Sequence, residues 1–123
     1  MKKRGVILLC HGSRLPETRR TLERLQEMIG EGKGFVAVKG AFLQFTQPDL
    51  PAALAQMSQL GLEQVVVVPL FLVDGVHVKK DIPEILNRER ARYPQMEIIM
   101  AGHIGAHRKL AEIILERIQE VIS

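Results

Sequence analysis

The 123-residue sequence has a single cysteine, no tryptophan, one tyrosine and four phenylalanines. One cysteine excludes a disulfide within the chain, which is typical of proteins from a reducing compartment. No apolar run approaches the ~20 residues that a membrane-spanning helix needs. The apolar run after the basic N-terminus is also too short for a secretory signal. The sequence therefore predicts a cytoplasmic protein that does not enter a membrane.

The shortage of aromatic residues also bears on nucleic-acid binding. The formal net charge of +3 is only mildly basic, and single-stranded nucleic acid is recognised by basic residues interleaved with aromatic ones. Phe35, Phe42 and Phe45 lie in or beside one apolar run, where we expect them to pack in the core. We therefore expect no nucleic-acid partner, and an anionic small ligand in preference to a cationic one.

Motifs of several common enzyme classes are missing. The sequence has no Walker loop and no G-x-G-x-x-G, so we expect no nucleotide or other organic cofactor. Ser13 lacks the glycine-flanked turn of the serine hydrolases. The spacing from Cys10 to Arg14 is shorter than the loop of a cysteine phosphatase requires. Cys10 is therefore expected to be a small core residue.

What the sequence does contain is a regular alternation of short apolar runs and segments with helical periodicity. Strands are predicted at residues 5–10, 35–45, 64–69 and 96–101, and helices at residues 16–29, 48–60, 80–91 and 107–121. The last helix is expected to bury a face formed by Leu110, Ile113, Ile114, Ile118 and Val121. Four such units predict a single α/β domain over residues 1–123.

The composition of the strands indicates how they are arranged. Strands that are apolar throughout are typical of a parallel sheet covered by helices on both faces. With right-handed crossovers, the economical order of four strands is 2-1-3-4, the doubly wound, flavodoxin-like arrangement. Ligands then bind beyond the carboxyl ends of the strands, at the switch point between the first and third strands.

A histidine stands in each of the two segments that follow those strands. His11 comes directly after the first strand, and His77 lies in the long segment after the third. Neighbouring strands lie about 5 Å apart, so we expect the two imidazoles to face each other across a cleft. Two histidines at an open site are suitable ligands for cobalt, nickel, iron or zinc. The nearby Gly12 and Gly75 allow the backbone to approach a ligand.

Basic residues cluster around the same two segments. Arg14, Lys79 and Lys80 are placed to meet the carboxylates of a ligand at the mouth of the cleft. Arg19 and Arg20 are expected on the solvated surface of a helix.

Two further histidines follow the fourth strand, one position farther from the switch point. We expect His103 at the rim of the cleft and His107 at the start of the last helix.

One alternative function for these residues is that of a phosphate-handling enzyme in which His11 is the nucleophile. Histidine phosphatases, however, carry an arginine before that histidine, and this chain has Cys10 there.

Taken together, these residues resemble the class II, ATP-independent tetrapyrrole chelatases, in particular the short CbiX-type sirohydrochlorin cobaltochelatases. The resemblance is carried by residues 9–14, by residues 41–43 leading to Pro48, and most specifically by residues 69–83. It implies insertion of Co²⁺, or in related members Fe²⁺ or Ni²⁺, into the anionic tetrapyrrole sirohydrochlorin during cobalamin biosynthesis. It also implies that His11 and His77 bind the metal and assist deprotonation of the pyrroles, and that a chain of this length forms a homodimer with facing sites.

The resemblance also implies which residues surround the macrocycle. Many relatives carry a glutamate soon after the second strand, where this chain has Gln44, so a third ligand is left open between Gln44 and His103. The residues expected to contact the substrate are Gly12, Ser13, Arg14, Gln44, Phe71, Leu72, Gly75, Val76, Lys79, Lys80 and His103. The competing interpretation is a carrier that binds metal or tetrapyrrole stoichiometrically and does not catalyse insertion.

Overall fold

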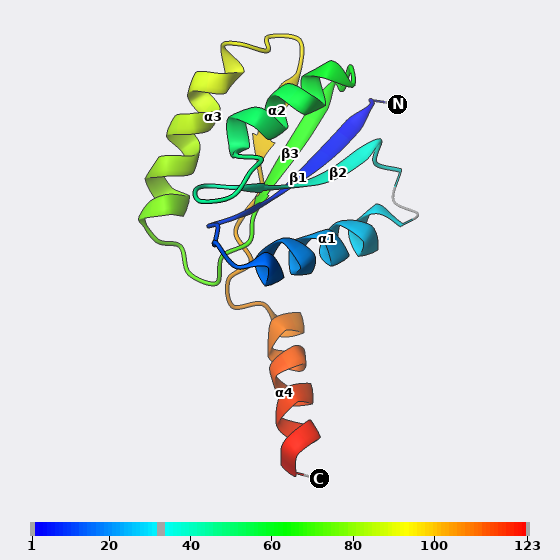
Figure 1. Ribbon diagram of the computed structural model, residues 1–123, viewed down its shortest axis with the longest axis vertical. Helices are drawn as coiled ribbons and strands as arrows, with labels where there is room; N and C mark the ends of the chain where they lie inside the picture. Colours follow the sequence, from blue (N-terminus) through cyan, green and yellow to red (C-terminus); the bar gives the residue numbers. More distant parts are fainter. Residues whose placement is uncertain (1, 32–33, 123) are drawn as a thin grey trace.

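The computed structural model describes residues 2–31 and 34–122, apart from the side chain of His77. It contains a four-stranded parallel sheet in the order β2-β1-β3-β4, which confirms the predicted order (Figure 1). The strands are β1 (Arg4–Cys10), β2 (Ala37–Phe42), β3 (Gln64–Pro69) and β4 (Glu97–Met100). The helical elements are α1 (Pro16–Gly30), α2 (Leu50–Gln59), the π-helical turn η1 (His77–Asp81), α3 (Ile82–Arg90) and α4 (Arg108–Ile122).

The register of the sheet brings the ends of three strands to one edge. Cys10 at the end of β1 pairs with Phe42 at the end of β2, and Leu9 pairs with Pro69 at the end of β3. The segments that follow β1, β2 and β3 therefore begin side by side. This is the edge at which doubly wound proteins bind their ligands.

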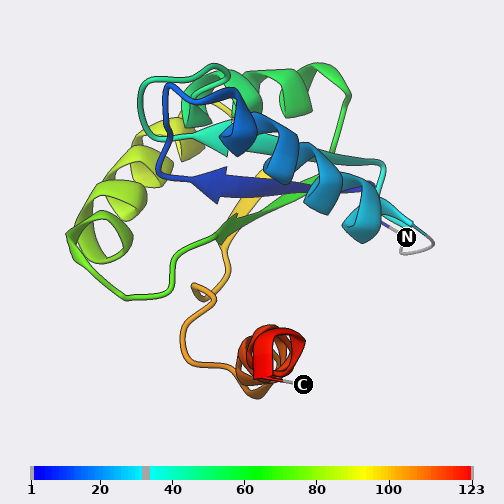
Figure 2. The same cartoon turned by 60° about the horizontal axis from the view of Figure 1, so that its bottom comes forward.

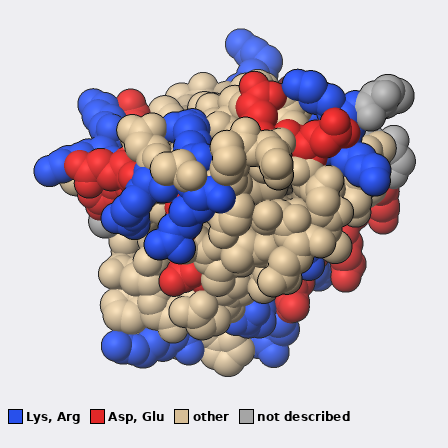
Figure 3. All heavy atoms as spheres, turned by 90° about the horizontal axis from the view of Figure 1, so that it is seen from above, with Lys and Arg blue, Asp and Glu red and all other residues tan. Residues whose placement is uncertain are grey.

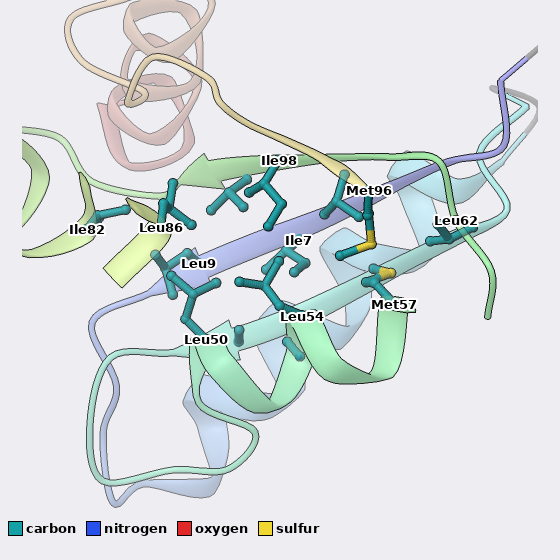
Figure 4. Close-up of a cluster of buried hydrophobic side chains, with 14 of the residues drawn as sticks. Ile7, Leu9, Leu50, Leu54, Met57, Leu62, Ile82, Leu86, Met96 and Ile98 are labelled. Atoms are coloured by element: carbon teal, nitrogen blue, oxygen red, sulfur yellow. The ribbon is translucent and has the colours of Figure 1, made fainter. Parts of the chain in front are cut away.

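The larger core lies between the sheet and the helices α2 and α3 (Figure 4). Alternate residues of each strand point into it, and they meet the apolar faces of the two helices. The fully buried side chains include Ile7, Leu9, Val65, Val67, Leu50, Leu54, Met57, Ile82 and Leu86. Burying one such aliphatic side chain stabilises the fold by about 1.5–3 kcal/mol, so this layer holds the sheet rigid beneath the carboxyl edge.

The opposite face of β1 and β2 is covered by α1. Leu22 of α1 is buried against Val6, Leu8 and Phe42. The helix can approach because Gly40 of β2 has no side chain, and an added Cβ there would lie 2.4 Å from Leu22 Cδ2. Helices therefore lie on both faces of the sheet, as predicted.

The prediction that Phe45 packs in the core is wrong. Phe35 and Phe42 do pack in the layer beneath α1, but Phe45 is 58% exposed. The predicted strand was too long, because β2 ends at Phe42 and the chain turns away. Phe45 itself has a φ of 68°, which no regular strand contains.

The prediction that α4 buries an apolar face on the sheet is also wrong. No described residue of α4 is buried, and Ile113, Ile114, Ile118 and Val121 are 43–81% exposed. Figures 1 and 2 show the helix standing clear of the sheet, beyond the carboxyl ends of the strands. Helical periodicity identifies an apolar face, but it does not say which surface that face covers.

The helices within residues 2–31 and 34–122 include none that is long and apolar enough to span a membrane. Seen from above in Figure 3, lysines and arginines alternate with acidic side chains around a broad uncharged area. This face therefore presents charges of both signs and no continuous basic surface.

Candidate functional site

His11 is the first residue after β1, and hydrogen bonds fix its backbone. Its carbonyl oxygen accepts from the backbone nitrogen of Leu43 at 3.1 Å and from that of Gln44 at 3.0 Å. These bonds tie the turn after β1 to the loop after β2. The position of His11 thus depends on two segments that are distant in the sequence.

Gly12 allows this close approach of the two loops. It has a φ of 114°, a conformation that L side chains rarely adopt. A Cβ added to Gly12 would lie 1.8 Å from the carbonyl oxygen of Gln44. The glycine is therefore required by contact between two backbones within the protein.

The imidazole of His11 lies between residues of two other loops. Its Nε2 is 2.6 Å from the side-chain amide nitrogen of Gln44. The ring of Phe71, from the segment after β3, meets the imidazole edge-on, with 6.5 Å between ring centroids. Nε2 is the atom through which a neutral imidazole with its proton on Nδ1 binds a metal ion.

His77 is the first residue of η1, and its side chain lies outside the described part of the structure. The turn is anchored by Val78, which is buried in the core, and by a 2.9 Å hydrogen bond from Lys79 N to Gly75 O. η1 follows β3, which neighbours β1 in the sheet. That the imidazoles of His11 and His77 face each other stays a prediction.

The segment after β3 presents apolar side chains to solvent. Leu72, Val73 and Val76 are 65–75% exposed, whereas Phe71 packs partly against the core. Leu72 and Val76 were expected to contact substrate, and Val73 was not. Exposed apolar residues that gather at one edge mark a surface for binding.

Arg14 stacks on an aromatic ring at the same edge. Its guanidinium carbon lies 4.5 Å from the centroid of the Phe45 ring, a cation–π contact. Phe45 is therefore a further candidate for the site that the sequence did not reveal, because its pattern suggested a strand. Arg19 and Arg20 are exposed on α1, as predicted, and Arg19 also donates to the carbonyl of Gln47 and lies 5.6 Å over the Phe42 ring.

Three other residues that the sequence analysis singled out, Ser13, His103 and His107, lie in the turns after β1 and β4. Ser13 Oγ accepts from Leu15 N at 3.0 Å, which supports the turn into α1. Half-buried His103 lies in the segment after β4, where Gly105 N donates to Phe71 O at 3.2 Å. The loops after β3 and β4 are thereby joined. As predicted, His107 starts the last helix, and its Nδ1 accepts from Lys109 N at 3.0 Å.

A cleft of about 300 Å³ opens beside Gln44, between the loop after β2 and the start of α3. It is lined by Leu43, Gln44, Asp81, Glu84, Ile85 and Arg88. Asp81 and Glu84 are functional candidates that the sequence analysis missed, although their spacing at the start of a helix places them on one face. The cleft is at the lower limit for a small-molecule site, so this cleft alone does not enclose a macrocycle.

Among the described residues, no three histidine, cysteine, aspartate or glutamate side chains form a group that could hold a metal ion. This search does not include the side chain of His77. The described side chains of these four types therefore form no three-ligand metal site at His11.

Cys10 ends β1 and is half-buried against the layer beneath α1. Burial raises the pKa of its thiol, because the thiolate loses hydration. At pH 8 we therefore expect iodoacetamide to alkylate Cys10 at least about tenfold more slowly than a free thiol. Mass spectrometry of the native and urea-unfolded chain measures the rates. Equal rates in the two states would contradict the core role of this cysteine.

Comparison with known proteins agrees with this fold. A model of the CbiX family matches residues 5–121. The sirohydrochlorin cobaltochelatase of Methanopyrus kandleri is 34% identical over 96% of both chains. That of Methanosarcina barkeri is 30% identical over 98% of both chains.

Solved structures give the same result. A protein described as a cobalamin (vitamin B12) biosynthesis CbiX protein, from Marinobacter aquaeolei VT8, is 32% identical and superposes with a TM-score of 0.80 over 95% of each chain. The chelatase SirB of Bacillus subtilis subspecies spizizenii, solved with cobalt, has a TM-score of 0.88 at 24% identity, and this chain covers 51% of it. The second likeness concerns the fold alone. The chain described here belongs to the CbiX family.

Proposed function

We propose that this chain inserts a divalent metal, Co²⁺ in the first place, into sirohydrochlorin without using ATP. The observation that carries the proposal is the match of nearly the whole chain to sirohydrochlorin cobaltochelatases. The site supports it, because His11 stands at the switch point of the sheet, with its Nε2 beside the side-chain amide of Gln44. The chain is accordingly a chelatase, and the metal is a substrate.

The histidines bind the metal before insertion. Neutral His11 takes Co²⁺ through the Nε2 atom that Gln44 contacts in the free chain, and His77 supplies the second ligand. Water fills the remaining positions. Gln44 keeps the imidazole oriented until the metal replaces its hydrogen bond.

Insertion releases two pyrrole protons for each metal that enters the ring. When the metal passes to the ring nitrogens, the lone pairs of His11 and His77 become free. Each imidazole is then a general base close to the departing protons. Charge is conserved, because one divalent cation replaces two protons.

The macrocycle binds through its carboxylates and its apolar faces. Arg14, stacked on Phe45, and the exposed Lys79 and Lys80 provide positive charge at the mouth of the site. The exposed Leu72, Val73 and Val76 offer apolar contact to the ring. We propose that these contacts hold the ring distorted, with its nitrogens directed at the metal.

The functional unit we propose is a homodimer with facing sites. The cleft on one chain has a volume of about 300 Å³ and opens at an edge, whereas a tetrapyrrole needs an enclosing cavity. A second copy facing this edge closes the site. In this unit each chain contributes one face of the cavity.

Turnover distinguishes an enzyme from a carrier. We expect a catalytic amount of the chain, with excess Co²⁺ and sirohydrochlorin, to convert many ring equivalents per chain. The change in the tetrapyrrole absorption spectrum measures the rate against a sample without protein. Conversion that stops at about one ring per chain would favour the carrier, and a rate equal to the protein-free rate would overturn the proposal.

A further inference from the structure

Phe45 combines an exposed aromatic ring with an unfavourable backbone conformation. Among the residues that the structure describes, it is the one non-glycine with a positive φ, at 68°. A bulky side chain rarely adopts this left-handed conformation. The residue is 58% exposed and packs in neither of the two core layers. Neither backbone preference nor burial therefore accounts for a phenylalanine here, and backbone outliers of this kind cluster where proteins bind ligands.

Hydrogen bonds hold the loop that carries Phe45 against the turn after β1. The backbone nitrogen of Gln44 donates to the carbonyl of His11 at 3.0 Å. On the other side of Phe45, Thr46 Oγ1 donates to the carbonyl of Ser13. Figures 1 and 2 show the loop after β2 running beside the turn after β1 at the carboxyl edge of the sheet. Both neighbours of Phe45 are thus tied to the turn that carries His11, so the ring projects from a fixed backbone.

Arg14 covers one face of the ring and brings a positive charge with it. Its guanidinium carbon lies 4.5 Å from the centroid of the Phe45 ring. None of the ion pairs among the described residues involves Arg14, whereas the exposed Arg20 pairs with Glu17. A guanidinium stacked on an aromatic face keeps its planar fork of N–H donors free at the rim of the ring. Phe45 therefore orients a cation that is available to an external carboxylate.

This pair of side chains lies beside the candidate metal ligand. The side-chain amide of Gln44, the residue before Phe45, is 2.6 Å from His11 Nε2. Arg14 follows His11 in the same turn. A macrocycle that takes a metal ion from His11 extends outward on all sides from its central nitrogens. Its conjugated periphery and its carboxylates therefore reach the loop that carries Phe45.

We propose that Phe45 is a substrate-binding residue that stacks on the conjugated face of the tetrapyrrole, while Arg14, held on the same ring, binds a carboxylate at the edge of the macrocycle. This role rests on the proposed function, because sirohydrochlorin is the ligand that it takes. An aromatic ring on a fixed backbone sets the tilt of the macrocycle, and an oriented cation sets its rotation. The positive φ of Phe45 serves to direct the ring out of the loop and towards the substrate.

Binding of metal-free sirohydrochlorin to a Phe45→Asn chain tests the proposal, because asparagine tolerates a positive φ and the substitution removes the ring. Quenching of the tetrapyrrole fluorescence, titrated with the full chain in the absence of metal, gives the Kd. We expect roughly tenfold weaker binding, the size of loss found when an aromatic residue that stacks on a nucleic-acid base is removed. Phe45→Tyr keeps the ring and should bind as tightly as the unmodified chain.

Leu60→Asn is the matched control for the loss of an exposed apolar side chain. Leu60 is 50% exposed and lies at the end of α2, shortly before β3 begins. It is therefore at the opposite end of the sheet from Phe45. This variant should bind sirohydrochlorin as tightly as the unmodified chain.

Further readouts separate substrate binding from a structural role. Phe45→Asn should raise KM for sirohydrochlorin more than it lowers kcat, because the contact lies away from the reacting nitrogens. Calorimetry should give an unchanged Co²⁺ affinity. The Tm should not fall, because asparagine relieves the backbone strain. Arg14→Gln should also weaken binding, and the double variant should lose less than the product of the two single losses, since the two side chains act together.

The outcomes that would overturn the proposal are distinct from those that would refute chelatase activity. Equal sirohydrochlorin affinity in Phe45→Asn and the unmodified chain would overturn it. So would a lower Tm with lost Co²⁺ affinity, which would indicate a structural role, or a changed sedimentation coefficient with intact sirohydrochlorin affinity, which would place Phe45 between subunits. An unmodified chain that binds the macrocycle through Phe45 without inserting metal would refute the chelatase alone. One that binds no sirohydrochlorin would overturn both.

Discussion

A Gly12→Ala chain should insert metal on the order of 100-fold more slowly, the loss typical when catalytic groups are misplaced by about 1 Å. The new Cβ would lie 1.8 Å from the carbonyl oxygen of Gln44, which is a backbone atom and cannot rotate away. The loops after β1 and β2 must therefore separate. That movement breaks the hydrogen bonds to the carbonyl of His11 and withdraws Gln44 from the imidazole.

The same substitution should lower stability, because alanine rarely adopts a φ of 114°. Backbone strain of this kind costs on the order of 1–3 kcal/mol, which corresponds to a fall in Tm of roughly 5–10 °C. Thermal unfolding and the insertion assay measure the two effects. Gly102→Ala is the matched control, since an added Cβ there meets nothing within 4 Å. Equal behaviour of the two variants would contradict the role given to Gly12.

A His11→Ala chain should bind Co²⁺ on the order of 100-fold more weakly than the unmodified chain, at the upper end of the losses seen when metal sites are altered. Alanine removes Nε2, one of the two imidazole donors in the proposed metal site. Alanine at this position keeps the backbone bonds to Leu43 and Gln44 available, because they involve only the carbonyl of residue 11. The fold should therefore persist while the affinity falls.

Isothermal titration calorimetry with Co²⁺ measures this affinity. His107→Asn serves as the control, because it removes an imidazole while asparagine preserves a side-chain acceptor at the start of α4. The control should bind Co²⁺ as tightly as the unmodified chain. Unchanged affinity in His11→Ala, or an equal loss in His107→Asn, would show that Co²⁺ binds elsewhere.

The strand order, and with it the edge of the sheet where the candidate site lies, could be predicted from the sequence. Continuous apolar runs such as the one in β3 are distinctive, and right-handed crossovers leave few topologies. His11 could be placed at the switch point because it directly follows β1. The start of α4 directly after His107 could also be predicted, since a polar residue before an apolar periodic segment is typical of a helix start.

Features that depend on contact between distant loops could not be predicted. The contact of Gln44 with His11 exists because Gly12 lets two backbones meet. Phe45 continues an apolar run in the sequence, and only its positive φ turns it out to meet Arg14. The exposure of α4 was missed because the periodicity of a helix is the same whether its apolar face covers the sheet or stands clear of it.

The measurement that tests the central claim most directly is the initial rate of Co²⁺ insertion into sirohydrochlorin, compared among the unmodified chain, His11→Ala, His77→Ala and a protein-free sample. We predict clear acceleration by the unmodified chain, a fall to about the protein-free rate in both variants, and full activity in His107→Asn. An unmodified chain that does not exceed the protein-free rate would contradict the proposed chelatase activity. Full activity in either histidine variant would contradict metal binding by that histidine.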